Sequence, residues 1–201
     1  MQVDLEPPFL LIKPGTEEEF YGIVGEDSDW EYLDGRLVMS PASDLHEDLF
    51  SFLMALLRTF LDLREGGIVR GSRYPMRLDP KWSPEPDLLV VRHERRHLLT
   101  SRRLEGPADF VIEIASDADP DFDLREKLPR YEAAGIEEIW LINPLVKTVL
   151  VKTRTATGYS STTLSAGRLT SKIVPGFWID VSWLWQEKLP STFACLQQIL
   201  A

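Results

Sequence analysis

The segment at residues 108–116, in the middle of the chain, is apolar on both faces of the strand that it predicts, except at Glu113. The apolar residues are Phe110, Ile112 and Ile114 on one face and Val111 and Ala115 on the other. A strand of this kind belongs in the centre of a sheet that is covered on both sides. An ionised carboxylate there is costly unless a charge, a hydrogen-bond donor or a metal compensates it.

A second carboxylate, that of Asp87, opens another apolar strand at residues 87–92. Two strands that each carry one such acid indicate a site built on a sheet. A plainer interpretation is a buried Glu113 paired with an arginine for structural reasons, because ion pairs of that kind also occupy such positions. The two acids alone leave both interpretations open.

The composition predicts one globular domain over residues 1–201, of which residues 1–15 are Pro-rich and expected to be irregular. No apolar run reaches the length of a membrane span, and residues 1–4 lack the features of a signal peptide. The single Cys195 suits a reducing compartment, so we expect a cytoplasmic protein. The net charge of -10 argues against a passive nucleic-acid coat protein but not against a metal nuclease.

The pattern of strands and helices predicts a single α/β domain with a mixed (α+β) sheet and helices on both sides. Asp34-Gly35 between two apolar runs predicts an N-terminal hairpin, and a capping-box sequence at residues 16–19 predicts a short helix. A long helix is expected over 44–64, with an apolar stripe that begins at Leu45 and a stop at Gly66-Gly67. Further strands are expected at 68–78, 110–115 and 138–143, with C-terminal antiparallel strands at 147–153, 158–164 and 169–174 and a terminal helix from about 182, interrupted near 190.

A second helix is expected at residues 121–134, with Leu124, Leu128 and Tyr131 on its apolar stripe. Lys127 falls on the same stripe, three residues after Leu124 and four before Tyr131, and is predicted to point toward the sheet. Pro129 removes one backbone hydrogen bond and should kink or restart this helix.

Asp87, Glu113 and Lys127 together suit metal-assisted phosphodiester hydrolysis. Paired carboxylates favour Mg²⁺ or Mn²⁺, which take oxygen ligands and keep several waters. A lysine beside them can orient a metal-bound water and stabilise charge that develops on the phosphate. The pattern Pro-Asp, a spacer, then Asp/Glu-x-Lys is the signature of the PD-(D/E)xK nucleases.

Most of the chain resembles one branch of that superfamily, the restriction endonucleases of the Uma-two type. The resemblance rests on the order and spacing of several short motifs, none of them specific alone. They are Asp34-Gly35, Ser40-Pro41, His46, Pro86-Asp87, Glu113-Ile114-Ala115-Ser116, Asp123-Leu124-Arg125-Glu126-Lys127, Tyr131, residues 135–144 and Val174-Pro175-Gly176-Phe177. It implies a restriction-endonuclease-like core, a divalent-metal DNase site at Asp87 and Glu113, DNA as the partner and, from family habit, a homodimer. The backbone carbonyl of Ile114 is then a further candidate metal ligand.

The chain departs from the generic motif at Ala115, which stands where the motif has its lysine. Members of the family usually supply this lysine from the next helix, and the corresponding residue here is Lys127. Arg36 stands where members often carry a glutamate. These departures keep a second hypothesis open, a catalytically degenerate nuclease fold that binds nucleic acid or protein. Three residues are candidates for the edge of the site: His46, Asp123 and Ser116.

The connection between the two acid-bearing strands is basic. It carries Arg92, Arg95, Arg96, Arg102 and Arg103. Because it should lie next to the site, we predict that it contacts the phosphate backbone of DNA, with a solvated loop as the alternative. The same segment contains His93-Glu94-Arg95-Arg96-His97, which matches the H-E-x-x-H pattern of zinc metalloproteases. That remote alternative needs a helix, and no histidine follows to complete the zinc site.

Overall fold

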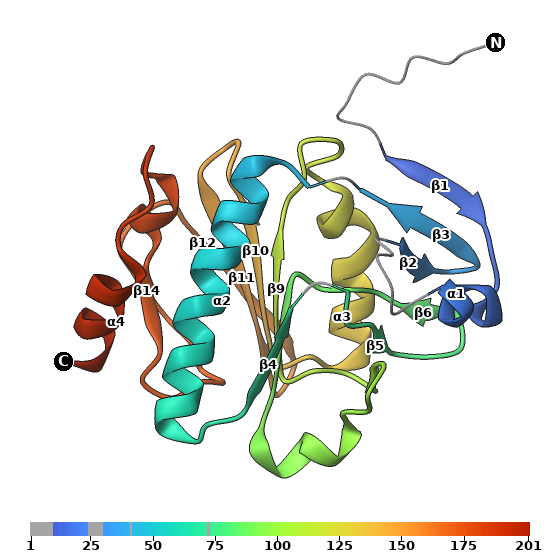
Figure 1. Ribbon diagram of the computed structural model, residues 1–201, viewed down its shortest axis with the longest axis horizontal. Helices are drawn as coiled ribbons and strands as arrows, with labels where there is room; N and C mark the ends of the chain where they lie inside the picture. The colour runs from blue at the N-terminus through green and yellow to red at the C-terminus, as the bar shows by residue number, and fades with distance from the viewer. Residues whose placement is uncertain (1–9, 24–29, 41, 72) are drawn as a thin grey trace.

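A central mixed sheet carries the chain's two apolar strands side by side (Figure 1). The computed structural model describes residues 10–23, 30–40, 42–71 and 73–201. Among these residues the largest sheet has six strands in the order β12-β11-β10-β9-β7-β4. Their bounds are Ile68–Gly71 (β4), Leu88–Val91 (β7), Phe110–Ile114 (β9), Glu138–Asn143 (β10), Thr148–Thr155 (β11) and Gly158–Leu164 (β12). Only the pairing of β9 with β10 is parallel within this sheet.

Strand β9 is buried on both faces, as its sequence predicts. One face packs with the buried side chains of helix α2 (Asp44–Arg64), and the other with those of helix α3 (Leu128–Ala134). Figure 1 shows the two helices on opposite sides of the sheet. The expected mixed α/β architecture with helices on both sides is therefore confirmed.

Helix α2 has the predicted bounds, and the hydroxyl of Ser43 accepts a hydrogen bond from the backbone N–H of His46 at its start. One detail of the prediction is wrong, because Leu45 is 43% exposed and lies outside the buried stripe. The residue that follows the helix, Glu65, takes a left-handed conformation (φ 51°) directly before Gly66-Gly67.

A second sheet, β1-β3-β2-β6, contains the predicted hairpin of β2 (Trp30–Leu33) and β3 (Arg36–Met39). Its turn residues Asp34 and Gly35 both have positive φ, as the tight turn requires. β6 is Trp82–Ser83, and β1 is Leu11–Pro14, which pairs with β3. The prediction of irregular structure is therefore wrong for residues 11–14, and residues 1–9 lie outside the described residues. Helix α1 (Glu17–Ile23) begins with the reciprocal hydrogen bonds of a capping box.

The helix expected over 121–134 is divided into a π-helical turn, η2 (Asp123–Lys127), followed by α3. Pro129 explains the division, because its ring would clash with the carbonyl of residue 125 in a regular α-helix and it has no N–H to donate. Leu124 is 44% exposed, so its place on the apolar stripe is wrong, whereas Lys127 and Tyr131 are buried as predicted.

The strand expected over 68–78 is interrupted, since Arg73 has a left-handed φ of 69°. β5 (Met76–Arg77) pairs instead with β8 (Leu104–Glu105).

The basic connection forms a 3-10 helix, η1 (His93–Leu98). The C-terminal part contains β13 (Arg168–Thr170), β14 (Trp178–Asp180), η3 (Val181–Trp185) and α4 (Thr192–Leu200).

Residues 171–174 do not continue the strand that the sequence predicted at 169–174. The buried carboxylate of Glu138 accepts hydrogen bonds from the hydroxyl of Ser171 (2.7 Å) and from the backbone N–H groups of Lys172 and Ile173 (both 3.0 Å). These backbone groups are thus unavailable to a strand partner. None of the helices in the described ranges is both long enough and apolar enough to cross a bilayer.

Candidate active site

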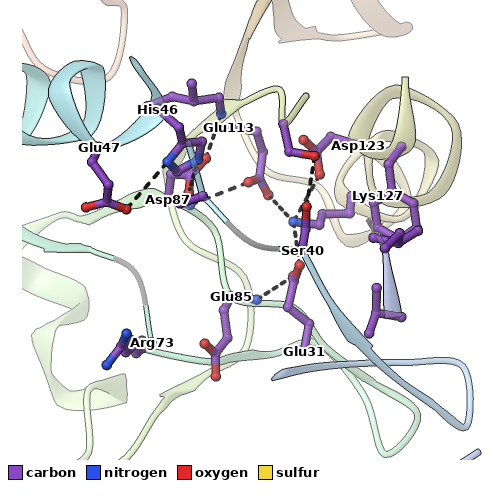
Figure 2. Close-up of a pocket in the computed structure, with 16 residues that line it drawn as sticks. Glu31, Ser40, His46, Glu47, Arg73, Glu85, Asp87, Glu113, Asp123 and Lys127 are labelled. Atoms are coloured by element: carbon purple, nitrogen blue, oxygen red, sulfur yellow. Dashed lines mark hydrogen bonds and ion pairs between the residues drawn. The ribbon is translucent and has the colours of Figure 1, made fainter. Parts of the chain in front are cut away.

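The carboxylates of Asp87 and Glu113 line one cavity of about 380 Å³ (Figure 2). Antiparallel pairing of β7 with β9 sets Leu88 opposite Ile112, which brings Asp87 beside Glu113. The backbone N–H of Ile114 donates to Asp87 Oδ2 at 2.6 Å, and the N–H of Asp87 donates a longer bond to Glu113 Oε2 at 3.4 Å. The sheet register therefore joins the two acids that the sequence singled out.

Lys127 points into the same cavity from η2, as predicted, and is almost completely buried. Its ammonium lies 3.0 Å from Asp123 Oδ1 and 3.3 Å from Glu113 Oε1. Tyr131, one turn later, donates its hydroxyl proton to the same Glu113 oxygen at 2.5 Å. Two buried donors from the helical layer thus hold Glu113 Oε1.

Glu31 of the hairpin also contacts Lys127, with 3.0 Å between Oε1 and Nζ. Its other oxygen accepts a hydrogen bond from the backbone N–H of Glu85 at 2.9 Å. Glu31 was not among the site residues predicted from the sequence. The signal was nevertheless present, because Glu31 is a lone acid between Trp30 and Tyr32 in a largely apolar strand, as Glu113 is in β9.

The three candidate edge residues all line the cavity. His46 Nε2 lies 3.1 Å from Asp87 Oδ1, and Asp123 contacts Lys127 as described. Ser116 accepts a hydrogen bond from the hydroxyl of Ser40 at 2.8 Å. The structure therefore brings all three to the pocket of Asp87 and Glu113.

The cavity has more acidic than basic side chains. Its titratable lining residues are Glu31, Glu47, Glu85, Asp87, Glu113 and Asp123 on the acidic side and His46, Arg73 and Lys127 on the basic side. Burial raises the pKa of Glu113 well above its usual range; Lys127 opposes this shift, and Asp123, Asp87 and Glu31 add to it. Burial likewise raises the pKa of Glu31 and of Asp123. Keeping these acids ionised therefore costs free energy, and a cation or a proton in the cavity would reduce that cost.

Burial acts on the pKa values of the two basic groups in the opposite direction, but the neighbouring acids outweigh it. Burial alone would lower the pKa of Lys127, but Asp123, Glu113 and Glu31 outweigh burial and raise it well above its usual range. Burial also lowers the pKa of His46, while its hydrogen bond to Asp87 and the charge of that acid more than reverse the effect. Lys127 is therefore a charged ammonium at neutral pH.

The sequence of the chain matches the Uma2 family model, described as putative restriction endonuclease, over residues 17–182. The chain belongs to the Uma2 family. Every residue of the cavity named above falls within the matched range. Among the solved structures, the fold is similar to that of a putative nuclease belonging to DUF820 from Anabaena variabilis ATCC 29413. The TM-score is 0.73 at 16% sequence identity, over 86% of this chain and 98% of the other. No curated protein matches the sequence.

In this Uma2 chain the basic connection does not lie beside the cavity, and that part of the prediction is wrong. Asp87 and Arg92 flank opposite ends of β7, which separates them by about 16 Å along the strand. In Figure 1 the 3-10 helix is the green coil at the lower edge, whereas α2 begins at the upper edge. The antiparallel direction of β7 carries the chain away from the acids.

Several of the predicted DNA-binding arginines have partners in the protein. Arg92 and Arg95 contact the buried carboxylate of Asp109 at 3.3 and 2.7 Å, and Arg92 also pairs with Glu137. Arg103 pairs with Glu105, Arg102 donates to the backbone carbonyl of Tyr21, and Arg96 lies 3.4 Å from a ring nitrogen of His93. A role of these arginines in DNA binding stays a prediction. Of Arg92, Arg95 and Arg96, Arg96 is the most exposed.

The geometry needed for a zinc protease is absent from the segment 93–97. A 3-10 helix has three residues per turn, so His93 and His97 project about 120° apart, rather than the roughly 40° of an α-helix. The ring of His97 instead lies 3.2 Å from the carbonyl oxygen of Glu94. The literal motif match does not form a ligand pair here.

The donor chemistry at the cavity fits a hard divalent cation. Within the described ranges, no cluster of three or more His, Cys, Asp or Glu side chains is arranged to hold a metal ion. Mg²⁺, however, is commonly held by one or two carboxylates while it keeps several waters. Asp87 and Glu113 are two carboxylates on one cavity, and Glu113 Oε2 accepts the long bond from the N–H of Asp87. Ile114 also lines the cavity, and its backbone carbonyl stays the predicted further ligand.

Proposed function

We propose that this protein is a divalent-metal-dependent DNA endonuclease that hydrolyses phosphodiester bonds. The observation that carries the proposal is the meeting of Asp87, Glu113 and Lys127 in one cavity, from three separate elements. Membership of a family described as putative restriction endonuclease supports it. In this proposal residues 1–201 form one domain with a restriction-endonuclease-like core, namely the central sheet with α2 and α3.

Asp87 and Glu113, with the Ile114 carbonyl, would hold Mg²⁺ or Mn²⁺. Such a metal polarises a phosphoryl oxygen and lowers the pKa of a bound water. Other residues of the chain orient the two carboxylates. Tyr131 and the Ile114 N–H fix the two carboxylates in orientation, through Glu113 Oε1 and Asp87 Oδ2 respectively. The rigid carboxylates require little reorganisation when substrate arrives.

Lys127 would orient the attacking water and offset the negative charge that develops on the phosphate. Its ammonium is charged, buried and next to Glu113, so it acts in surroundings where its field is weakly screened. His46, Asp123 and Ser116 would form the edge of the site. His46 is placed to orient Asp87, and Asp123 to hold Lys127.

The test is cleavage of supercoiled, linear and single-stranded DNA with Mg²⁺ or Mn²⁺, compared with excess chelator. We expect metal-dependent cleavage by the wild type and its loss in Asp87→Asn and Glu113→Gln. Asp62→Asn, at an exposed acid of α2 that pairs with Arg58, is the matched control and should cleave normally. Absence of cleavage by folded wild type on all three DNAs would reject the proposal.

A second candidate function is a catalytically degenerate nuclease fold that binds nucleic acid or protein. The observation that favours it is the occupancy of Glu113 Oε1 by both Lys127 and Tyr131, so that the lysine already serves as a counter-ion for the acid. This candidate predicts DNA binding that is the same in wild type, Glu113→Gln and Lys127→Met, without cleavage in any of them.

A further inference from the structure

Two ion pairs join the hairpin to η2, and they differ in burial. Arg36 and Glu126 pair at 3.0 Å with their side chains 38% and 29% exposed. Glu31 and Lys127 pair at the same distance with only 16% and 5% exposed. Phe122, directly before η2, clusters with Leu33 and Val38 of the hairpin. The hairpin therefore forms a wall of the cavity and is docked on the helical turn that carries Lys127.

Glu31 is held from the opposite side as well. Its Oε2 accepts the backbone N–H of Glu85, two residues before Asp87. A single carboxylate thus links the connection between β6 and β7, which leads to Asp87, with the ammonium of Lys127. Figure 2 shows Glu31 below Lys127, with Glu113 on the other side of the ammonium.

The three acids around Lys127 are not equivalent. Asp123 belongs to the same helical turn as Lys127, four residues earlier, so it moves with the lysine and restricts only its rotamer. Glu113 is one of the groups toward which the ammonium must be aimed. Glu31 comes from the second sheet, so it restrains the ammonium from an element that does not move with η2. A long lysine side chain loses considerable rotamer entropy on ordering and needs such restraint.

We propose that Glu31 is a positioning residue of the active site, which aims the Lys127 ammonium at the cavity beside Glu113. This inference rests on the proposed nuclease function. It also makes the N-terminal hairpin part of the site, rather than a cover over its edge. The ordinary alternative is that Glu31 only fastens the hairpin to the rest of the fold.

The Arg36–Glu126 pair separates these two roles, because it joins the same two elements and neither of its residues lines the cavity. Glu31→Gln keeps the acceptor for the Glu85 N–H and removes the charge that faces Lys127. Arg36→Gln breaks the outer pair and leaves Lys127 untouched. A fastening role predicts similar consequences for the two variants, and a positioning role predicts a difference.

The first measurement is steady-state DNA cleavage. We expect Glu31→Gln to lower kcat by roughly 10- to 100-fold with KM changed little, as for a misplaced catalytic group. Arg36→Gln should keep kcat within about twofold of the wild type, the size of effect usual for an exposed pair. Equal kcat in the two variants would overturn the proposal. If Glu31→Gln melts below the assay temperature, Glu31→Asp, which withdraws the charge by one methylene, gives the same comparison.

The second measurement does not depend on nuclease activity. Lysines are acetylated with a water-soluble ester, and modification of Lys127 relative to the exposed Lys13 is followed by peptide mass spectrometry. Lys127 should be protected in wild type and Arg36→Gln and modified several-fold faster in Glu31→Gln, because an unrestrained amine samples open rotamers. Equal protection in all three proteins overturns the positioning role. A wild type that cleaves no DNA rejects the proposed function, and this measurement then still decides the role of Glu31.

Discussion

The Lys127 ammonium lies 3.3 Å from Oε1 of Glu113, although the two residues belong to different layers of the fold. Ala115 occupies the strand position at which the generic nuclease motif carries its lysine. Lys127 of the helical layer places an ammonium beside the same carboxylate. A charge can reach a carboxylate from any element within side-chain length, so the proposed chemistry does not require a lysine at position 115.

Replacement of Lys127 by Met tests this relationship most directly. The variant keeps much of the stem and loses the charge, so DNA cleavage should be abolished while metal binding survives. Glu113→Gln, in contrast, should lose both, because it removes a ligand. Calorimetric titration with Mn²⁺ beside a plasmid assay checks the pair. Loss of Mn²⁺ binding in Lys127→Met would show that the lysine supports the metal site and not the water.

The raised pKa of Glu113 predicts a pH dependence of stability in metal-free protein. An acid whose pKa is higher in the folded state binds more protons when folded, so its unfavourable effect at neutral pH fades as pH falls through the folded-state pKa. Glu113→Gln should therefore be more stable than wild type at neutral pH, and the difference should shrink on acidification. Thermal melts in chelator at several pH values check this, with Asp62→Asn as the control. A difference that grows toward acid would contradict it.

The buried carboxylate of Asp109 predicts a structural role for two of the arginines in the basic connection. Arg92→Ala with Arg95→Ala leaves this carboxylate without its two side-chain partners and should cost about 3 kcal/mol of unfolding free energy. Arg96→Ala, at an exposed position in the same helix, should leave stability unchanged and is the control. Urea denaturation measures both. Equal stability of the double variant and wild type would show that water or another group replaces the arginines.

The geometry of η1 predicts that the purified protein holds no stoichiometric zinc. His93→Ala should leave both folding and any nuclease activity largely intact, because His93 is exposed and its ring lies beside the exposed Arg96. Elemental analysis of purified wild type and variant checks this. One tightly bound zinc per chain that disappears in the variant would revive the metalloprotease hypothesis.

Local sequence patterns were enough to locate most of the elements that build the site. The Asp34-Gly35 turn, the bounds of α2 and the apolar strands β7, β9 and β10 follow from turn chemistry, capping and short continuous apolar runs, all of which act over a few residues. The two acids could be recognised for the same reason, since each interrupts an apolar pattern. Lys127 could be assigned to the buried face by its spacing of four residues from Tyr131, although Leu124, three residues earlier, is exposed.

Only the tertiary structure decided how these elements face one another. The direction of β7 places the basic connection about 16 Å from Asp87, and the docking of the hairpin on η2 brings Glu31 to Lys127. Around the 3-10 helix, Arg92 and Arg95 are likewise fastened to Asp109 of a distant segment. Local patterns fix what a segment becomes, because their interactions are local. Contacts between distant segments depend on strand direction, register and docking, which no short stretch of sequence encodes.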